Sequence, residues 1–150
     1  MTAVVKQSET NWQFMQPTEP LSRATAEALL DAALDARTRA YARYSKFEVG
    51  AAVLVDDDIV IPGCNVENAS YGGTVCAERV AIFNAVCSGY HRIRAIAVIA
   101  DQPEPIAPCG ICLQVISEFS DHAIVLMANL SGMVEIERFS ALFPRSFTLD

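Results

Sequence analysis

The chain has 150 residues, of which 52% are hydrophobic, and its formal net charge is −7. This length and apolar content indicate one globular domain with a substantial core, and more apolar surface than a small monomer needs. The 11 Lys and Arg residues are scattered, so no basic stripe is available for polymeric nucleic acid, which we exclude as a partner.

The first half of the chain predicts an arm, a helix and a hairpin. Residues 1–20 have no clear periodicity and are expected to form a loose N-terminal arm, with the domain proper at residues 21–150. Apolar residues recur at three- and four-residue steps from Leu21 to Tyr44, which predicts a helix. Val49 to Val55 and Ile59 to Ile61, joined by three aspartates, predict a β-hairpin.

The second half alternates helices and strands. A helix is predicted from Val75 to Val86, with Thr74 as its N-cap, and another from Cys109 to Phe119. Strands are predicted at Ile93–Ala100, Ala123–Met127 and Val134–Phe139. This order predicts an α/β fold with one mixed sheet and helices packed on its faces.

The cysteine count and the hydropathy pattern bear on the compartment. Five cysteines without an apolar leader segment indicate free thiols in a reducing environment. No apolar run reaches the ~20 residues that a membrane span requires. We therefore expect a cytoplasmic protein that does not insert into a membrane.

Three of the cysteines have the spacing of zinc ligands. Cys109 and Cys112 form a CxxC at the start of a predicted helix, and Cys76 begins the preceding one. Helix N-termini favour the thiolate form. Cys87 is too far along its helix to share the ion, whereas Cys64, His91 and His122 stay open as a fourth ligand. Three ligands and one open position is the simplest count and is typical of a catalytic zinc.

Glu78 distinguishes a catalytic from a structural zinc site. It follows Cys76 by two residues, so on a helix it flanks the ion without binding it. A hydrolytic site needs such a carboxylate to take a proton from water and return it to the substrate. Cys-x-Glu followed by Pro-Cys-x-x-Cys is typical of zinc deaminases.

The sequence resembles the small homotetrameric cytidine deaminases from about Leu21 to Phe147. Four motifs carry the resemblance: Tyr44-Ser45-Lys46-Phe47-Glu48-Val49-Gly50-Ala51-Ala52, Asn65-Val66-Glu67-Asn68-Ala69-Ser70-Tyr71, Cys76-Ala77-Glu78-Arg79, and Pro108-Cys109-Gly110-Ile111-Cys112 with Gln114. The resemblance implies a three-layer fold with a five-stranded mixed sheet and a homotetramer. It also implies one Zn²⁺ per chain and hydrolytic deamination of cytidine and deoxycytidine in pyrimidine salvage, with Glu78 as the catalytic residue.

The resemblance also implies a set of substrate-binding residues. Phe47 corresponds to a phenylalanine that stacks on the pyrimidine. Asn65 and Glu67, which share one face of an extended stretch, correspond to a pair that holds the ribose hydroxyls. The remaining members of the expected set are Ala69, Tyr71, Ala77 and Phe147, of which Tyr71 and Phe147 belong to sites completed by a neighbouring subunit.

One position departs from the family pattern. Leu113 follows Cys112, where the family usually has an arginine. Arg79, three residues after Cys76, is then the candidate cation beside the thiolates. Two alternatives stay open: a zinc deaminase for another amino-heterocycle, against which Asn65 and Glu67 argue, and a non-enzymatic zinc-stabilised binding protein, against which Glu78 argues.

Overall fold

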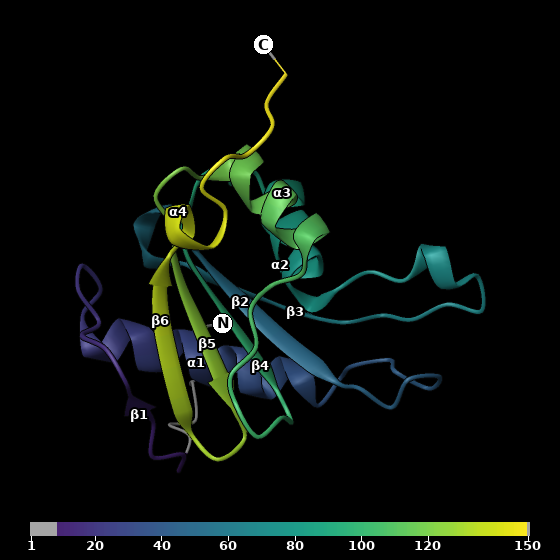
Figure 1. Cartoon of the computed structure of the whole chain (residues 1–150), viewed down its shortest axis with the longest axis horizontal. Coiled ribbons are helices and arrows are strands. Elements are labelled where there is room, and N and C mark those ends of the chain that lie inside the picture. The colour runs from purple at the N-terminus through teal and green to yellow at the C-terminus, as the bar shows by residue number, and fades with distance from the viewer. Residues whose placement is uncertain (1–8, 150) are drawn as a thin grey trace.

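A computed structural model describes residues 9–149, and it contains one mixed sheet of six strands (Figure 1). The strand order is β1-β6-β5-β4-β2-β3. Strands β4 and β5 run parallel, as do β1 and β6, and the other neighbours are antiparallel. The bounds are β1 Gln13–Phe14, β2 Val49–Val55, β3 Val60–Cys64, β4 Ile93–Ala100, β5 Ile124–Asn129 and β6 Met133–Arg138.

Helices cover both faces of the sheet, which confirms the expected three-layer α/β architecture. Helix α1 (Arg23–Arg37) crosses one face, and α2 (Ala77–Cys87) and α3 (Gly110–Phe119) lie on the other (Figure 1). A four-residue helix, α4 (Phe139–Leu142), follows β6. Strand β2 is buried at all seven positions, because both of its faces are covered. Among the described residues, no helix is long and apolar enough to cross a membrane.

The sheet has one strand more than the five we expected, because residues 13–14 pair with β6. Trp12 is only 4% exposed, and its Nε1 donates a hydrogen bond to Asp31 Oδ1 of α1 at 2.8 Å. Trp12 and residues 13–14 thus contact the body, and residues 1–8 of the predicted arm lie outside the described residues. A loose arm at residues 1–20 stays a prediction. The division of the chain at residue 20 stays a prediction.

Two helix boundaries differ from the prediction. Helix α1 begins after its N-cap Ser22 but ends at Arg37, short of Tyr44, because the backbone N–H of Tyr41 donates to the carbonyl of Asn65 instead. Helix α2 begins at Ala77, and its N-cap is Cys76 and not Thr74, whose hydroxyl is buried without a partner among the described residues. Periodicity alone cannot detect either tertiary contact.

A glycine lets α2 approach the sheet closely. A Cβ at Gly63 on β3 would lie 2.3 Å from the backbone nitrogen of Ala81 and 2.7 Å from the carbonyl oxygen of Ala77. Only a residue without a side chain fits there. The N-terminal turn of α2 is thereby held against β3, and this turn carries three of the predicted site residues, Ala77, Glu78 and Arg79.

Candidate active site and metal centre

Three cysteines converge where the N-termini of α2 and α3 meet. Cys76 is the N-cap of α2, Cys109 is the N-cap of α3, and Cys112 lies in the first turn of α3. Their Sγ atoms all lie within 4.8 Å of one another, and those of Cys76 and Cys109 are 3.9 Å apart. The structure thus brings together the three residues that sequence spacing selected as ligands.

The spacing of the sulfur atoms fits a tetrahedral zinc ion. At the usual Zn–S distance of about 2.3 Å, tetrahedral geometry places two sulfur ligands about 3.8 Å apart. Cys64 is not part of this cluster, since its Sγ lies 3.4 Å from the carbonyl oxygen of Arg39. Within residues 9–149, these three cysteines are the only group of metal-ligating side chains so placed. Three thiolates leave a fourth position for a reactant.

The surroundings of the cysteines favour a thiolate at Cys76. A hydrogen bond with the Cys112 thiol, followed by the contact with Arg79, lowers the pKa of Cys76 to about 5. The Nη2 atom of Arg79 lies 3.4 Å from the Cys76 sulfur. The contact with Cys76, with burial adding to it, raises the pKa of the Cys112 thiol. Cysteine binds zinc as a thiolate, so the lowered pKa of Cys76 prepares one of the three ligands for the metal ion.

Glu78 lies beside the cluster in the first turn of α2. Its side chain is 4% exposed, and this burial raises its pKa to about 7, because desolvation disfavours the ionised carboxylate. A carboxyl group with a pKa near neutrality can both accept and return a proton in water at pH 7. Burial and position therefore suit Glu78 for acid–base chemistry at a reactant held by the cysteines.

The two residues expected to influence the charge of the cluster lie in different environments. Arg79 contacts Cys76, but its Nε atom is buried without a hydrogen-bond partner among the described residues. Leu113 is partly buried and packs against the hydrophobic core on the α2–α3 side of the sheet. At the position where the resemblance led us to expect an arginine, the chain has an apolar side chain that packs against the core.

Asn65 and Glu67 are buried, and both make hydrogen bonds to the loop that carries Phe47. The Asn65 side chain accepts from Val49 N and donates to the carbonyl oxygen of Phe47, both at 2.8 Å. The Glu67 carboxylate accepts from the backbone of Tyr44 at 2.8 Å and from the hydroxyl of Ser45. The hydrogen bond from Ser45 lowers the pKa of Glu67, so its carboxylate is ionised at neutral pH. Ser45 lies in one of the four motifs but was not among the site residues predicted from the sequence.

The remaining predicted substrate residues differ in how far they are buried. Ala77 is fully buried at the start of α2, whereas Ala69 is exposed in the loop before it. Tyr71 is 62% exposed and lies 6.1 Å, centroid to centroid, from the ring of Tyr44. Phe147 is 66% exposed on the C-terminal tail, and its carbonyl oxygen accepts a hydrogen bond from Gln114 Nε2 at 2.8 Å.

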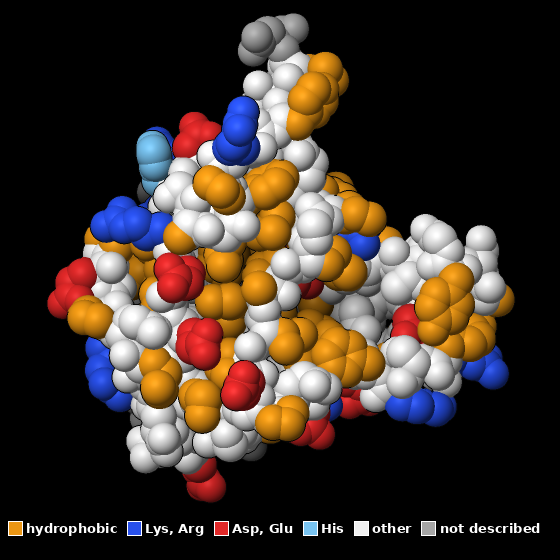
Figure 2. Space-filling model, viewed as in Figure 1, with side chains coloured by type: hydrophobic (Ala, Val, Ile, Leu, Met, Phe, Trp, Pro, Cys, Tyr) orange, Lys and Arg blue, Asp and Glu red, His pale blue; other side chains and the backbone are white. Residues whose placement is uncertain are grey.

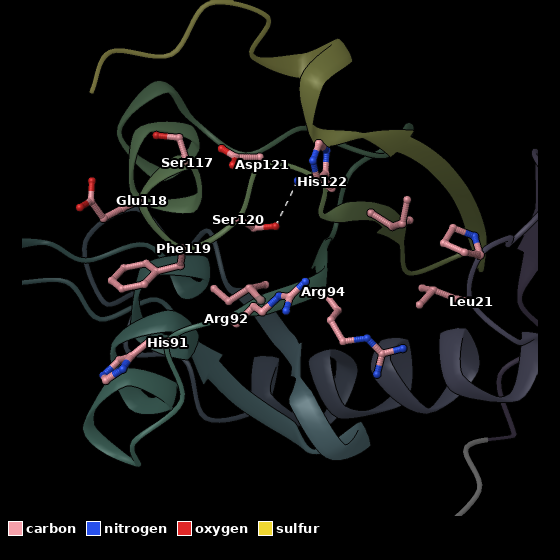
Figure 3. A pocket seen from close by; sticks show the side chains of 13 residues that line it. Leu21, His91, Arg92, Arg94, Ser117, Glu118, Phe119, Ser120, Asp121 and His122 are labelled. Carbon is pink, nitrogen blue, oxygen red and sulfur yellow. Dashed lines mark hydrogen bonds between the residues drawn. The ribbon is translucent and has the colours of Figure 1, made fainter. Parts of the chain in front are cut away.

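A pocket of about 490 Å³ lies away from the cysteines, around the C-terminal end of α3 (Figure 3). Side chains of both charges line it: His91, Arg92, Arg94, Glu118, Asp121 and His122. Arg94 is already paired with Asp58 at 2.7 Å, and the C-terminal end of a helix disfavours anions. Because side chains of both charges line the pocket, it favours no class of ligand. His91 and His122 lie in this pocket and not with the three cysteines, so neither is the fourth zinc ligand.

Fold and site together define a small α/β protein with a three-cysteine zinc centre and a buried carboxylate next to it. The family model described as "Cytidine and deoxycytidylate deaminase zinc-binding region" matches residues 23–128. The chain belongs to this family, and the matched zinc-binding region includes Cys76, Cys109 and Cys112.

Named relatives and solved structures agree with this assignment. The chain is 45% identical to a cytidine deaminase of Sporosarcina psychrophila over 81% of this chain and 90% of the relative. It is 46% identical to a cytidine deaminase of Halalkalibacterium halodurans over 83% and 95%. The crystal structure of cytidine deaminase from Burkholderia pseudomallei matches with a TM-score of 0.79 at 45% identity, covering 85% of this chain and all of that one.

Proposed function

We propose that this protein is a cytidine deaminase, which hydrolyses the 4-amino group of cytidine and deoxycytidine to give uridine or deoxyuridine and ammonia. The observation that carries the proposal is the position of Glu78, buried next to three converging cysteines with a pKa raised to about 7. A structural zinc site gains nothing from a buried carboxylate in this place, whereas hydrolysis needs one.

The proposed reaction consumes one water molecule, and Glu78 carries both of the protons that are transferred. A zinc ion held by Cys76, Cys109 and Cys112 would lower the pKa of a water molecule and so supply a nucleophile at neutral pH. Glu78 accepts the proton of this water and transfers it to N3 of the pyrimidine as the oxygen bonds to C4. Glu78 then takes the remaining proton of that water from the new C4 hydroxyl and carries it to the 4-amino group. The C4–N bond breaks, ammonia leaves, and the C4 carbonyl of the product forms. The carboxylate ends each cycle in the state in which it began.

Substrate binding is proposed to rest on the residues that the resemblance implies. Phe47 stacks on the pyrimidine, and Glu67 and Asn65 hold the ribose hydroxyls. An ionised Glu67 suits this role, because a charged acceptor makes strong hydrogen bonds to hydroxyl groups. Ala77 offers backbone groups to the base, while Ala69, Tyr71 and Phe147 complete the set.

We also propose that the active form is a homotetramer. Large apolar side chains are exposed on the loop before β2, on the loop between β3 and α2, and on the C-terminal tail: Tyr41, Tyr44, Val66, Tyr71, Phe147 and Leu149. Figure 2 shows hydrophobic groups on these projecting parts of the surface. A second copy would bury these groups and place Tyr71 and Phe147 at a neighbour's site. Light scattering on the purified protein should give four chains per particle, and truncation before Arg145 should reduce turnover more than stability. A fully active monomer would contradict the tetramer.

The biological setting follows from this reaction. Conversion of free cytidine and deoxycytidine returns the pyrimidine to general use, which is a salvage reaction. The five cysteines are all free in the structure, and free thiols persist in reducing compartments, so we propose a cytoplasmic location.

One assay tests the proposed activity. Zinc-loaded protein is mixed with cytidine, deoxycytidine, cytosine or adenosine, and the ultraviolet absorbance of each is followed. We expect cytidine and deoxycytidine to be consumed and cytosine and adenosine to be spared. Glu78→Gln should retain zinc and lose at least ~10²-fold in turnover, because the amide cannot accept a proton. Unchanged cytidine in the presence of fully zinc-loaded protein would overturn the proposal.

Zinc content is measured on the same samples by elemental analysis. We expect about one ion per chain, and most of it lost in Cys109→Ala, since that variant removes one of only three ligands. Full zinc retention in Cys109→Ala would contradict the ligand assignment without touching the assay of activity.

A further inference from the structure

The hydroxyl of Ser45 joins two residues that the proposed function places at opposite ends of the substrate. It donates a hydrogen bond to Glu67 Oε1, and it accepts one from the backbone N–H of Phe47 at 3.0 Å. We infer that Ser45 is a positioning residue that couples the ribose-binding carboxylate to the pyrimidine-stacking ring. This inference rests on the proposed substrate contacts.

The Glu67 carboxylate holds the loop at residues 44–47 in place through several hydrogen bonds. Besides the Ser45 hydroxyl, it accepts hydrogen bonds from the backbone N–H groups of Tyr44, at 2.8 Å, and of Ser45, at 3.2 Å. Its own backbone N–H donates to the carbonyl oxygen of Tyr41 at 2.8 Å. Glu67 is 5% exposed, and hydrogen bonds to an ionised carboxylate are stronger than those between neutral groups.

The other side of the loop is held by Asn65. Its amide donates to the carbonyl oxygen of Phe47 and accepts from Val49 N. Phe47 is thus tied through its N–H to Ser45 and through its carbonyl to Asn65. With one backbone group fixed on each side, the direction of the Phe47 side chain depends on both contacts.

The backbone between Ser45 and Phe47 needs such support. Lys46 has a φ of 61°, in the left-handed region that residues with side chains rarely adopt. A non-glycine residue persists in that conformation when its surroundings hold it there. The backbone N–H of Lys46 also donates to the carbonyl oxygen of Ala42 at 2.9 Å. The Ser45 hydroxyl is the one side-chain group of this turn that reaches both Glu67 and Phe47.

Removal of this hydroxyl should therefore weaken both ends of the site together. In Ser45→Ala, Glu67 loses a donor and Phe47 N loses its acceptor, so the loop relaxes while the zinc centre is untouched. We expect KM for cytidine to rise about 10-fold, the lower end of the effect of losing a hydrogen bond to a charged group, with kcat within about twofold. Zinc content should be unchanged. Ser45→Thr keeps the hydroxyl and should restore KM.

The control is Ser131→Ala, which removes another exposed serine hydroxyl that donates to a side chain, Asn129 Oδ1, in the β5–β6 turn. This variant should keep both KM and kcat. A Ser45→Ala protein whose KM equals that of wild type would overturn the inference. A fall in kcat with zinc loss would also overturn it, because the effect would then be a general loosening of the fold.

A second substrate separates the two halves of the proposed coupling. 2′,3′-Dideoxycytidine has the pyrimidine but lacks the 2′- and 3′-hydroxyls. If Ser45 positions Phe47 as well as Glu67, Ser45→Ala should raise KM for this compound too. An effect confined to cytidine would reduce Ser45 to a partner of Glu67 alone and would contradict the coupling.

Double-mutant cycles then distinguish failure of this inference from failure of the proposed contacts. On a Phe47→Ala background, Ser45→Ala should raise KM by less than it does alone, since the residue through which it acts is gone. Full additivity would overturn the inference. Phe47→Ala and Glu67→Gln variants that themselves leave KM unchanged would instead refute the proposed substrate contacts.

Discussion

The guanidinium of Arg79 donates to the sulfur of Cys76 at 3.4 Å, and it is the cation that meets the cysteine cluster in the described structure. The neighbouring position on α3, directly after Cys112, is the partly buried Leu113. Zinc with three thiolates carries a net charge of −1, so the charge balance of this centre depends on one arginine and two helix N-termini.

Arg79→Ala should weaken zinc binding. The variant removes the donor to Cys76 and leaves the thiolate charge opposed only by the helix ends, and loss of such partners typically costs 10–100-fold in metal affinity. Chelator competition measures the affinity directly. Arg94→Ala, which breaks an exposed ion pair with Asp58, is the matched control and should leave zinc affinity as it is. Equal affinities in both variants would refute this role of Arg79.

Leu113→Arg should move the acidic limb of the pH–rate profile to lower pH. Glu78 must be ionised to accept a proton, and burial raises its pKa above the ordinary value, so the rate falls as the pH falls through that pKa. A cation added nearby favours the carboxylate and lowers that pKa by about one pH unit. Leu113→Met preserves volume without charge and should leave the limb in place. The idea fails if Leu113→Arg folds, binds zinc and leaves the profile unmoved.

Glu78→Gln should stabilise the metal-free protein at pH 8. The folded-state pKa of about 7 lies above the ordinary value of 4.5, so ionisation of Glu78 costs stability progressively as the pH rises from 4.5 to 7. The full cost is about 3 kcal/mol above that window and vanishes below it. Denaturant unfolding at pH 8 and pH 4.5 measures both ends, with Glu104→Gln at an exposed loop position as control. Equal stabilisation at the two pH values would contradict the linkage.

Gly63→Ala should reduce both stability and zinc affinity. The added Cβ would lie 2.3 Å from the backbone of Ala81, so α2 must move away from β3 and carry Cys76 with it. Overpacking of this kind typically costs 1–3 kcal/mol. Gly50→Ala creates a similar clash with the carbonyl oxygen of Ala33 on α1, across the sheet, and should reduce stability alone. Wild-type zinc affinity in Gly63→Ala would show that this close approach does not position the ligand.

Trp12→Ala should cost about 3–5 kcal/mol in the free energy of unfolding, as expected for truncating a buried aromatic residue. Trp12→Phe removes mainly the hydrogen bond to Asp31 and should cost about 1 kcal/mol. Met15 is 60% exposed, so Met15→Ala should change stability by less than about 0.5 kcal/mol. Urea unfolding measures the stability of all three variants against that of the wild type. An unchanged midpoint in Trp12→Ala would mean that residues 9–20 add nothing to the fold.

The zinc centre could be predicted from the sequence because its chemistry is local. Cys109 and Cys112 share one helical turn, and Cys76 and Glu78 share another, so residue type and spacing determine which side chains can act together. The first helix was likewise visible as a periodic apolar pattern, and the hairpin as two short apolar runs joined by three aspartates. Such features depend on neighbours within a few residues.

Tertiary structure alone decided the features that join distant segments. No local pattern at residues 13–14 predicts a strand, because this strand forms only through pairing with β6 at residues 133–134. The helical pattern ran on to Tyr44, but the chain leaves the helix at Arg37 because Tyr41 finds its partner at Asn65. The hydrogen bonds that the Glu67 carboxylate accepts from Tyr44 and Ser45 span more than twenty residues. Contacts of this range are set by how the whole chain packs, and no spacing rule within a segment encodes them.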